Sequence, residues 1–184
     1  MTKTDLSQFD NAWYSPQAGI LKRASWFCIN AVFFMNPVFP FNGIKNFFLR
    51  IFGAKVGKGV VIKPGVNIKY PWLLKIGDYS WIGERVWIDN LAEVDIGKIV
   101  CISQGAFLLC GNHNYKKPSF DLETKKIILE EGVWIGAMAT VCPGVICHSH
   151  AVLAVGSVAT HHLESYTVYQ GNPAKKTRER SLKI

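Results

Sequence analysis

The stretch IGDYSWIGERVWIDNLAEVDIGKIVCISQGAFL, residues 76–108, carries an aliphatic residue at every sixth position except at one step. The same spacing continues outward on both sides, from Val56 to Ala159. A small or β-branched residue follows four positions later in nearly every case, and Gly often follows the aliphatic residue directly. The aliphatic series is Val56, Ile62, Ile68, Ile76, Ile82, Ile88, Ile96, Ile102, Leu108, Leu129, Ile135, Val141, Cys147, Leu153 and Ala159.

A period of six residues excludes one helical face, because six residues turn an α-helix by about 600° and scatter the apolar positions. Short strands separated by tight corners satisfy this period, and Gly suits a bend that has little room for a side chain. Three such strands form one triangular coil, and successive coils stack about 4.8 Å apart. The repeat therefore predicts an all-β parallel β-helix.

The fifteen repeats divide into five coils of three strands, and the spacing supports this division. It departs from six only between Ile68 and Ile76, between Ile88 and Ile96, and between Leu108 and Leu129. Each of these departures follows the third strand of a coil. All insertions are therefore predicted to leave the prism at one shared corner.

The sequence resembles the hexapeptide-repeat acyltransferases, and most closely the branch that acetylates sugars in exopolysaccharide assembly, similar to the colanic-acid biosynthesis acetyltransferases. The resemblance implies a left-handed parallel β-helix over residues 56–174, preceded by segment 1–55 and followed by a basic tail, 175–184. It is carried by Trp87-Ile88-Asp89-Asn90, Ile102-Ser103-Gln104-Gly105, Gly111-Asn112-His113-Asn114-Tyr115, Val133-Trp134-Ile135-Gly136 and Tyr169-Gln170-Gly171-Asn172-Pro173-Ala174.

His113 stands near the start of the longest insertion, residues 111–128. Transfer of an acetyl group from a thioester to a hydroxyl needs a base, and histidine has an unperturbed pKa near 6.5 that suits this role. The resemblance implies that His113 is the catalytic base and that acetyl-CoA is the co-substrate. The hydroxyl would attack the thioester directly, without an acetylated enzyme.

The coil before the insertion brings Asp89, Asn90 and Glu93 to the same side of the prism. One of them is expected to orient His113 or to contact the acceptor saccharide. The alternative is that Asp89 and Asn90 only form the polar corner of a coil. Tyr115, in the loop, is expected either to stack on a sugar ring or to pack against the protein.

The resemblance also implies a homotrimer with active sites between subunits and a donor groove along the later coils. The residues that match the groove by position are Ala137, Val155, Thr160 and His161. Lys175 and Arg178 in the basic tail could pair with the phosphates of the donor, although a solvated tail explains them equally well.

Three other functions remain open. An N-acetyltransferase acting on an amino sugar could use the same site, and a non-catalytic β-helix could serve as a scaffold. A zinc enzyme of the γ-class carbonic anhydrase type needs three converging histidines, and His113, His148 and His150 belong to different coils. We therefore expect no metal.

Residues 1–55 contain six Lys or Arg against two Asp or Glu, and Pro37 and Pro40 separate two expected helices, about 19–35 and 42–52. These helices are expected to cap the open first coil, to touch a membrane surface, or both. We expect a cytoplasmic protein, possibly placed at the inner face of the membrane, because the start lacks a signal peptide and the five cysteines lack disulfide or metal spacing. No nucleic-acid-binding module is recognised.

Overall fold

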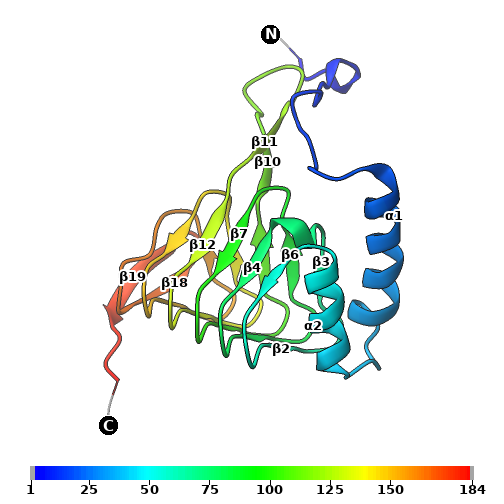
Figure 1. The fold of residues 1–184 in the computed structure, drawn as a ribbon. Coiled ribbons are helices and arrows are strands. Elements are labelled where there is room, and N and C mark those ends of the chain that lie inside the picture. The colour runs from blue at the N-terminus through cyan, green and yellow to red at the C-terminus, as the bar shows by residue number, and fades with distance from the viewer. Residues whose placement is uncertain (1–2, 183–184) are drawn as a thin grey trace.

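The computed structural model describes residues 3–182, which form a triangular prism of stacked coils with helices across one end (Figure 1). Three parallel sheets make up the sides. The first contains β1 (Lys55–Val56), β4 (Leu74–Ile76), β7 (Val94–Ile96), β12 (Ile127–Leu129) and β15 (Ile146–Cys147). The second contains β2 (Val61–Ile62), β5 (Trp81–Ile82), β8 (Cys101–Ile102), β13 (Trp134–Ile135), β16 (Val152–Leu153), β18 (Thr167–Gly171) and β19 (Ala174–Glu179). The third contains β3 (Asn67–Ile68), β6 (Trp87–Asp89), β9 (Phe107–Leu109), β14 (Thr140–Val141) and β17 (Val158–Ala159).

The sixfold spacing of aliphatic residues becomes the register of the sheets. Val56 is paired with Ile76, Ile76 with Ile96, and Ile96 with Leu129, and the other two sheets align their members of the series in the same way. Apart from Val56, every member of the series is buried and belongs to one continuous core. The predicted parallel β-helix is confirmed.

The corners explain the glycine pattern. Gly77 follows an aliphatic residue, and a Cβ placed on it would lie 2.6 Å from the backbone carbon of Gly97 in the next coil. The small residue is therefore required by the close stacking of backbones. A second kind of corner position has a left-handed backbone, as at Gly156, where φ is +64° and the space beside the Cα is open.

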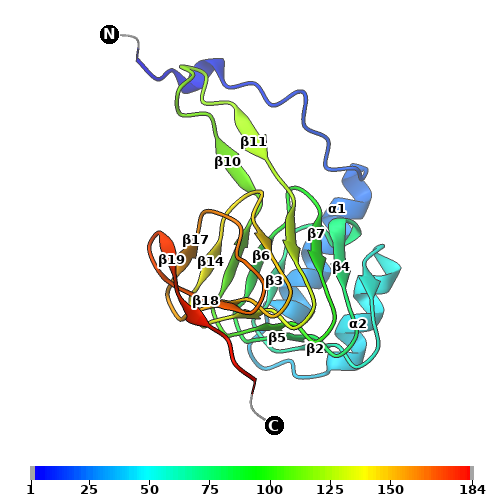
Figure 2. The same cartoon turned by 90° about the vertical axis from the view of Figure 1, so that its left-hand side faces the viewer.

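Every insertion leaves the prism between the third and the first sheet, as the spacing predicted. The largest forms an antiparallel hairpin of β10 (Gly111–His113) and β11 (Leu122–Thr124), which projects from the prism (Figure 2). The insertion between Ile68 and Ile76 contains a short 3-10 helix, Pro71–Leu73, at the same corner. It belongs to the first coil, next to the N-terminal helices.

The C-terminal end extends beyond the five predicted coils. Leu163 bridges to Cys147, and β18 pairs with β16, so two sides of a sixth coil are present. Part of the segment expected as a tail, 175–184, lies in β19, which folds back antiparallel on β18. The chain reversal occurs at Gly171, where φ is +105°.

The N-terminal helices cap the first coil through polar side chains. They comprise α1 (Ile20–Ile29), which continues into a π-helical turn (Asn30–Phe34), and α2 (Asn42–Ile51); a 3-10 turn, Leu6–Gln8, precedes them. Asn42 and Asn46 donate to the carbonyl of Val60, and the Nζ of Lys45 donates to the carbonyls of Ile62 and Lys63. The helices thus supply hydrogen-bond partners for backbone groups at the strand edges of the first coil.

Candidate active site

The hairpin holds His113 at the end of a short ladder. Gly111 pairs with Thr124, Asn112 with Glu123, and His113 with Leu122. A Cβ on Gly111 would approach the Cδ1 of Leu91 to 2.7 Å, so glycine lets the hairpin leave the prism close to the preceding coil. Backbone pairing in the hairpin, and its close contact with the preceding coil, therefore position His113.

The imidazole of His113 is oriented by Phe120 on the other side of the loop. Its Nδ1 lies 2.9 Å from the Phe120 carbonyl oxygen, and the two rings stack at 4.5 Å with planes 7° apart. A carbonyl only accepts hydrogen bonds, so Nδ1 carries the proton in the neutral ring and Nε2 has a free lone pair. Nε2 is the atom that can accept a proton from a substrate.

The N-terminal segment runs beside the same hairpin. The amide of Asp5 donates to the carbonyl of Pro118 at 2.8 Å, and the ring of Phe9 lies 5.9 Å from that of His113. Sequence reasoning missed this contact, because no spacing rule connects a residue near the start of the chain to a loop more than 100 residues later. Tyr115 is 74% exposed, and the structure shows no contact of its ring with His113.

The three polar residues of the preceding coil have other partners. Asp89 forms an ion pair with Lys69 at 2.9 Å, and Glu93 forms one with Lys75 at 2.6 Å. Asn90 is fully buried and exchanges hydrogen bonds with the backbone of Tyr70. The partner of the His113 Nδ1 is thus the Phe120 carbonyl rather than Asp89, Asn90 or Glu93, and Asn90 stabilises the corner of its coil.

Glu93 also lines a hollow beside the N-terminal segment. This hollow has a volume of about 570 Å³, and Trp13, Tyr14, Trp72 and Thr124 contribute to it. The hydroxyl of Tyr14 donates to the Leu91 carbonyl at 2.9 Å, which attaches the segment to the coil below His113. Burial raises the pKa of Tyr14 and keeps its hydroxyl protonated.

Three of the predicted donor residues lie together on the second sheet. Ala137, Val155 and Arg178 line one hollow of about 450 Å³, with Trp134 and Gly136 in its wall. The lining is mainly apolar, and Arg178 supplies one positive charge. This combination fits a ligand that has an apolar arm and phosphate groups.

The other three predicted donor residues do not join that hollow. Thr160 lines a separate hollow of about 400 Å³ beside the hairpin, together with Asn112 and Cys142. The hydroxyl of Thr160 hydrogen-bonds the Nδ1 of the exposed His161 at 2.9 Å. Lys175 is exposed and pairs in register with Gln170 across the β18–β19 hairpin.

His148 and His150 lie at another corner of the prism. His148 contacts Glu130 at 3.0 Å, and His150 stacks on Tyr166 at 4.7 Å, both between the first and the second sheet. Within residues 3–182, no group of three His, Cys, Asp or Glu side chains is close enough to hold a metal ion. His113, His148 and His150 do not converge within the chain.

Cys110 is close to His113 in sequence but is fully buried. Burial raises the pKa of its thiol to about 12, so almost no thiolate is present at neutral pH. All five cysteines are free. This placement indicates that Cys110 has a structural role.

Comparison with known proteins places the chain in a family. A protein of Escherichia coli named as the colanic acid biosynthesis acetyltransferase WcaF is 35% identical over 176 residues, covering 96% of this chain and 97% of the relative. The chain belongs to the hexapeptide-repeat acetyltransferases. No family model matches this acetyltransferase.

More distant relatives of this acetyltransferase share its fold. A galactoside O-acetyltransferase of Escherichia coli is 26% identical and covers 68% of the chain and 64% of its own length. A hexapeptide-repeat acetyltransferase of Vibrio cholerae, solved in complex with acetyl-CoA, superposes with a TM-score of 0.78 at 20% identity and 88% coverage of both chains. A maltose O-acetyltransferase of Clostridium difficile gives a TM-score of 0.75 at 18% identity, covering 89% of this chain and 88% of its own.

Proposed function

We propose that the protein transfers the acetyl group of acetyl-CoA to a hydroxyl of a saccharide used in building a cell-surface polysaccharide. The orientation of His113 carries this proposal, because its Nδ1 is bound to a carbonyl and its Nε2 has no hydrogen-bond partner among residues 3–182. The relative named for colanic acid biosynthesis, matched over nearly the whole chain, supports the class of substrate.

In the proposed reaction, Nε2 of His113 takes the proton of the acceptor hydroxyl as its oxygen attacks the thioester carbonyl carbon. The resulting tetrahedral intermediate collapses, the carbon–sulfur bond breaks, and the proton on Nε2 passes to the leaving thiolate. The Phe120 carbonyl accepts a hydrogen bond from Nδ1 throughout, which stabilises the imidazolium formed after the first step. Cys110 takes no part, because its thiol remains protonated.

The arrangement of the prism supports a site shared between subunits. His113 projects from the corner between the third and the first sheet, whereas Ala137, Val155 and Arg178 line a hollow on the second sheet. One chain therefore presents base and donor hollow on different sides. In a cyclic homotrimer, the hairpin of one subunit would reach the second sheet of its neighbour and unite the two.

For the acceptor we propose the side of the hairpin that faces the N-terminal segment. The exposed Trp13 offers an aromatic face for a sugar ring, and Glu93 offers a carboxylate for its hydroxyls. Asp89 and Tyr115 remain proposed acceptor contacts near this side. The free cysteines are consistent with a reducing cytoplasm, where we propose that the enzyme works.

The decisive experiment measures acetyl transfer by mass spectrometry with acetyl-CoA and a panel of sugars, nucleotide sugars and polyprenyl-linked sugars. His113→Ala should lower kcat/KM by about 10²–10⁴-fold, the usual contribution of a positioned base. His148→Ala is the matched control, because this partly exposed histidine lies at another corner, and it should retain activity.

Each outcome has a distinct meaning. Unchanged transfer by the His113→Ala variant would remove His113 as the base. Transfer confined to amino groups would replace the hydroxyl acceptor by an amino sugar. If acetyl-CoA failed to bind at all, the chain would be a scaffold rather than an enzyme.

A further inference from the structure

The helices at the end of the prism expose apolar side chains on their outer side and bury polar side chains, together with Trp26 and Leu49, against the first coil. In α2, the side chains that face the coils include Asn42, Lys45 and Asn46, and Lys45 is fully buried. The opposite face carries Ile44 and Phe47, which are 42% and 56% exposed. A helix on a water-exposed surface places its apolar stripe inward and its polar side chains outward.

The apolar outer surface continues through the whole N-terminal cap. We use the term cap face for the exposed apolar side chains of α1, the π-helical turn, the connecting loop and α2. Between residues 24 and 44 the chain contains no charged residue. Figure 1 shows both helices lying across the first-coil end, away from β18 and β19. The cap face consists of Ile20, Leu21, Phe27, Val32, Met35, Val38, Phe41, Ile44, Phe47 and Ile51.

The polar side chains on the inner side of the helices bind the open edge of the first coil. The first coil ends in free strand edges, and Asn30, Asn42, Asn46 and Lys45 are used to satisfy them. Trp26 adds a bond from its Nε1 to the Ile68 carbonyl at 2.8 Å. Polar side chains thus bind the first coil on the inside, and many exposed apolar side chains are left on the outside, which is typical of a docking surface.

The charge around the cap face is of one sign. Residues 11–77 contain nine Lys or Arg and no Asp or Glu, whereas residues 78–184 contain eleven of each. Arg50, Lys55 and Lys58 are exposed at the rim, and none of them forms an ion pair within the described residues. The net positive charge of the protein is therefore carried by the segment that forms the N-terminal helices and the first coil.

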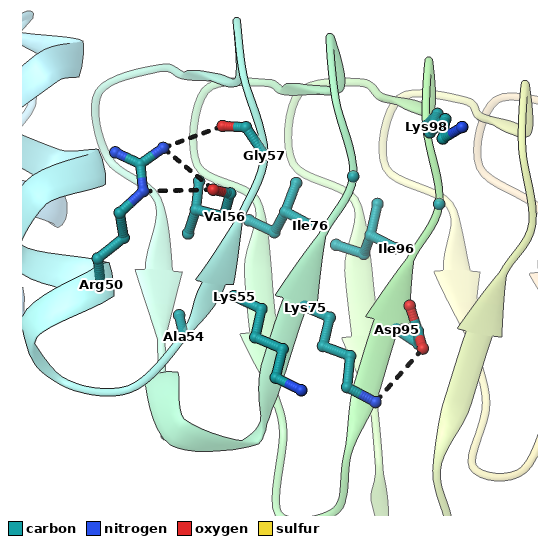
Figure 3. A pocket seen from close by; sticks show the side chains of 12 residues that line it. Arg50, Ala54, Lys55, Val56, Gly57, Lys75, Ile76, Asp95, Ile96 and Lys98 are labelled. Atoms are coloured by element: carbon teal, nitrogen blue, oxygen red, sulfur yellow. Dashed lines mark hydrogen bonds and ion pairs between the residues drawn. The ribbon is translucent and has the colours of Figure 1, made fainter.

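Figure 3 shows how this rim is arranged on the outer side of the first sheet. Arg50 reaches from α2 and donates to the carbonyls of Val56 and Gly57, and Lys55 and Lys75 extend along neighbouring strands. Together they line a hollow of about 580 Å³ whose only acidic residue is Asp95. This hollow opens at the end of the strands away from the His113 hairpin.

We propose that the cap face docks onto the surface of an anionic lipid bilayer. The apolar side chains would enter the boundary between headgroups and acyl chains, and the basic rim would contact lipid phosphates. An apolar face bordered by exposed Lys and Arg side chains is the composition that binds such surfaces. None of the helices in the described part is long and apolar enough to cross a bilayer.

The test is sedimentation of the full chain with vesicles of phosphatidylcholine alone and of phosphatidylcholine mixed with phosphatidylglycerol. The wild type should bind the mixed vesicles, and added salt should weaken binding because exposed charges are screened. The double variant Ile44→Asp/Phe47→Asp should bind about tenfold more weakly, because apolar area is lost and negative charge is added. Both side chains are exposed, so circular dichroism should show an unchanged fold.

A matched control separates the cap face from general charge effects. Ile99→Asp/Leu182→Asp adds the same charge at two exposed apolar side chains, 57% and 60% exposed, away from the cap. This variant should bind like the wild type. Equal losses in both double variants would overturn the proposal, because non-specific attraction would then explain the binding.

A tryptophan placed in the cap face reports how deeply this face enters the bilayer. Brominated lipids should quench the additional indole fluorescence of Phe47→Trp. They should not quench that of Leu182→Trp, which lies outside the cap face. Absence of wild-type binding to any vesicle would overturn the proposal. So would a concentration-dependent self-association that the Ile44→Asp/Phe47→Asp variant abolishes in ultracentrifugation, since a second copy would then be the occupant. Vesicle binding does not depend on acetyl transfer, so it can fail or succeed independently of the proposed reaction.

Discussion

At the scale of single residues, His113 is positioned by a group that no side-chain pattern reveals. Every residue has a backbone carbonyl, so the bond from Nδ1 of His113 to Phe120 leaves no trace in the sequence. Phe120 also has a left-handed backbone, with φ of +53°, which turns the loop back toward the hairpin. His113 could be singled out as the proposed base from its chemistry and the resemblance, whereas the partner of its Nδ1 required the fold.

Two substitutions at Phe120 separate its ring from its carbonyl. Phe120→Ala keeps the carbonyl and should lower kcat by about tenfold or less. Phe120→Pro cannot adopt the positive φ and should approach the loss expected for His113→Ala, about 10²–10⁴-fold. The KM for acetyl-CoA should change little in both, because the base rather than the donor hollow is displaced. Equal activity of the two variants in steady-state kinetics would contradict the orienting role.

The cysteines should differ in reactivity according to burial. Cys28 is exposed, whereas burial raises the pKa of Cys110 to about 12 and also raises that of Cys147. A raised pKa reduces the thiolate fraction at a given pH, so iodoacetamide at mildly alkaline pH should label Cys28 well before the other two. Peptide mass spectrometry gives the order. Early labelling of Cys110 in the folded protein would show that its site is open to water.

At the scale of elements, two corner positions with glycine have different physical requirements. Gly77 approaches the backbone of the next coil, and Gly156 has a left-handed backbone in open space. The sequence predicted where these corners occur, because the sixfold spacing sets them. It did not show which glycine lies against the backbone of the next coil and which has a left-handed backbone, because this depends on the three-dimensional stacking of the coils.

Replacing each glycine by alanine tests this difference. Gly156→Ala should lower the free energy of unfolding by about 1–2 kcal/mol, the cost of a left-handed backbone with a Cβ. Gly77→Ala should cost about 3 kcal/mol or more, because two backbones must separate. Urea unfolding gives both values. A smaller loss for Gly77→Ala than for Gly156→Ala would mean that the coils can move apart easily.

Lys45 in α2 makes the stability of the cap depend on pH. Desolvation lowers its pKa from 10.5 to about 8 in the folded protein. Below pH 8 the Lys45 side chain is protonated in both the folded and the unfolded state. The free-energy cost of burying its ammonium group is then independent of pH. Between the two values the unfolded chain binds more protons, so stability rises with pH.

This rise should be absent in Lys45→Met. The melting temperature of the wild type relative to this variant should therefore increase between a pH below 8 and one approaching 10.5. Calorimetry at the two pH values measures the difference, and other titrating groups cancel in the comparison. A constant difference would show that water reaches the ammonium group.

At the scale of the whole molecule, the series from Val56 to Ala159 predicted the sheets, their register and the corner that carries insertions. It could not predict the sixth partial coil, because the step from Ala159 to Leu163 is four residues rather than six. The outward direction of Ile44 and Phe47 was also not apparent, since an apolar stripe in a sequence does not state which side faces the core. Long-range contacts such as Phe9 with His113 follow from the fold alone.

A shared active site predicts complementation between two inactive variants. His113→Ala removes the base, and Ala137→Trp should fill the donor hollow on the second sheet. When the two are mixed and reassembled, about one site in four should combine an intact hairpin with an intact hollow. Activity should therefore return on mixing. No recovery in a preparation that light scattering shows to be mixed trimers would place the whole site within one chain.

The ends of the prism determine where assembly of the molecule stops. Each coil reproduces the edge on which it was built, so the repeat by itself has no fixed length and could continue from one molecule into the next, as strands do in a fibril. At one end Asn42, Asn46 and Lys45 occupy the carbonyls that another strand would need, and at the other β19 reverses direction on β18. The finite size of this enzyme thus depends on a few terminal contacts that lie away from His113.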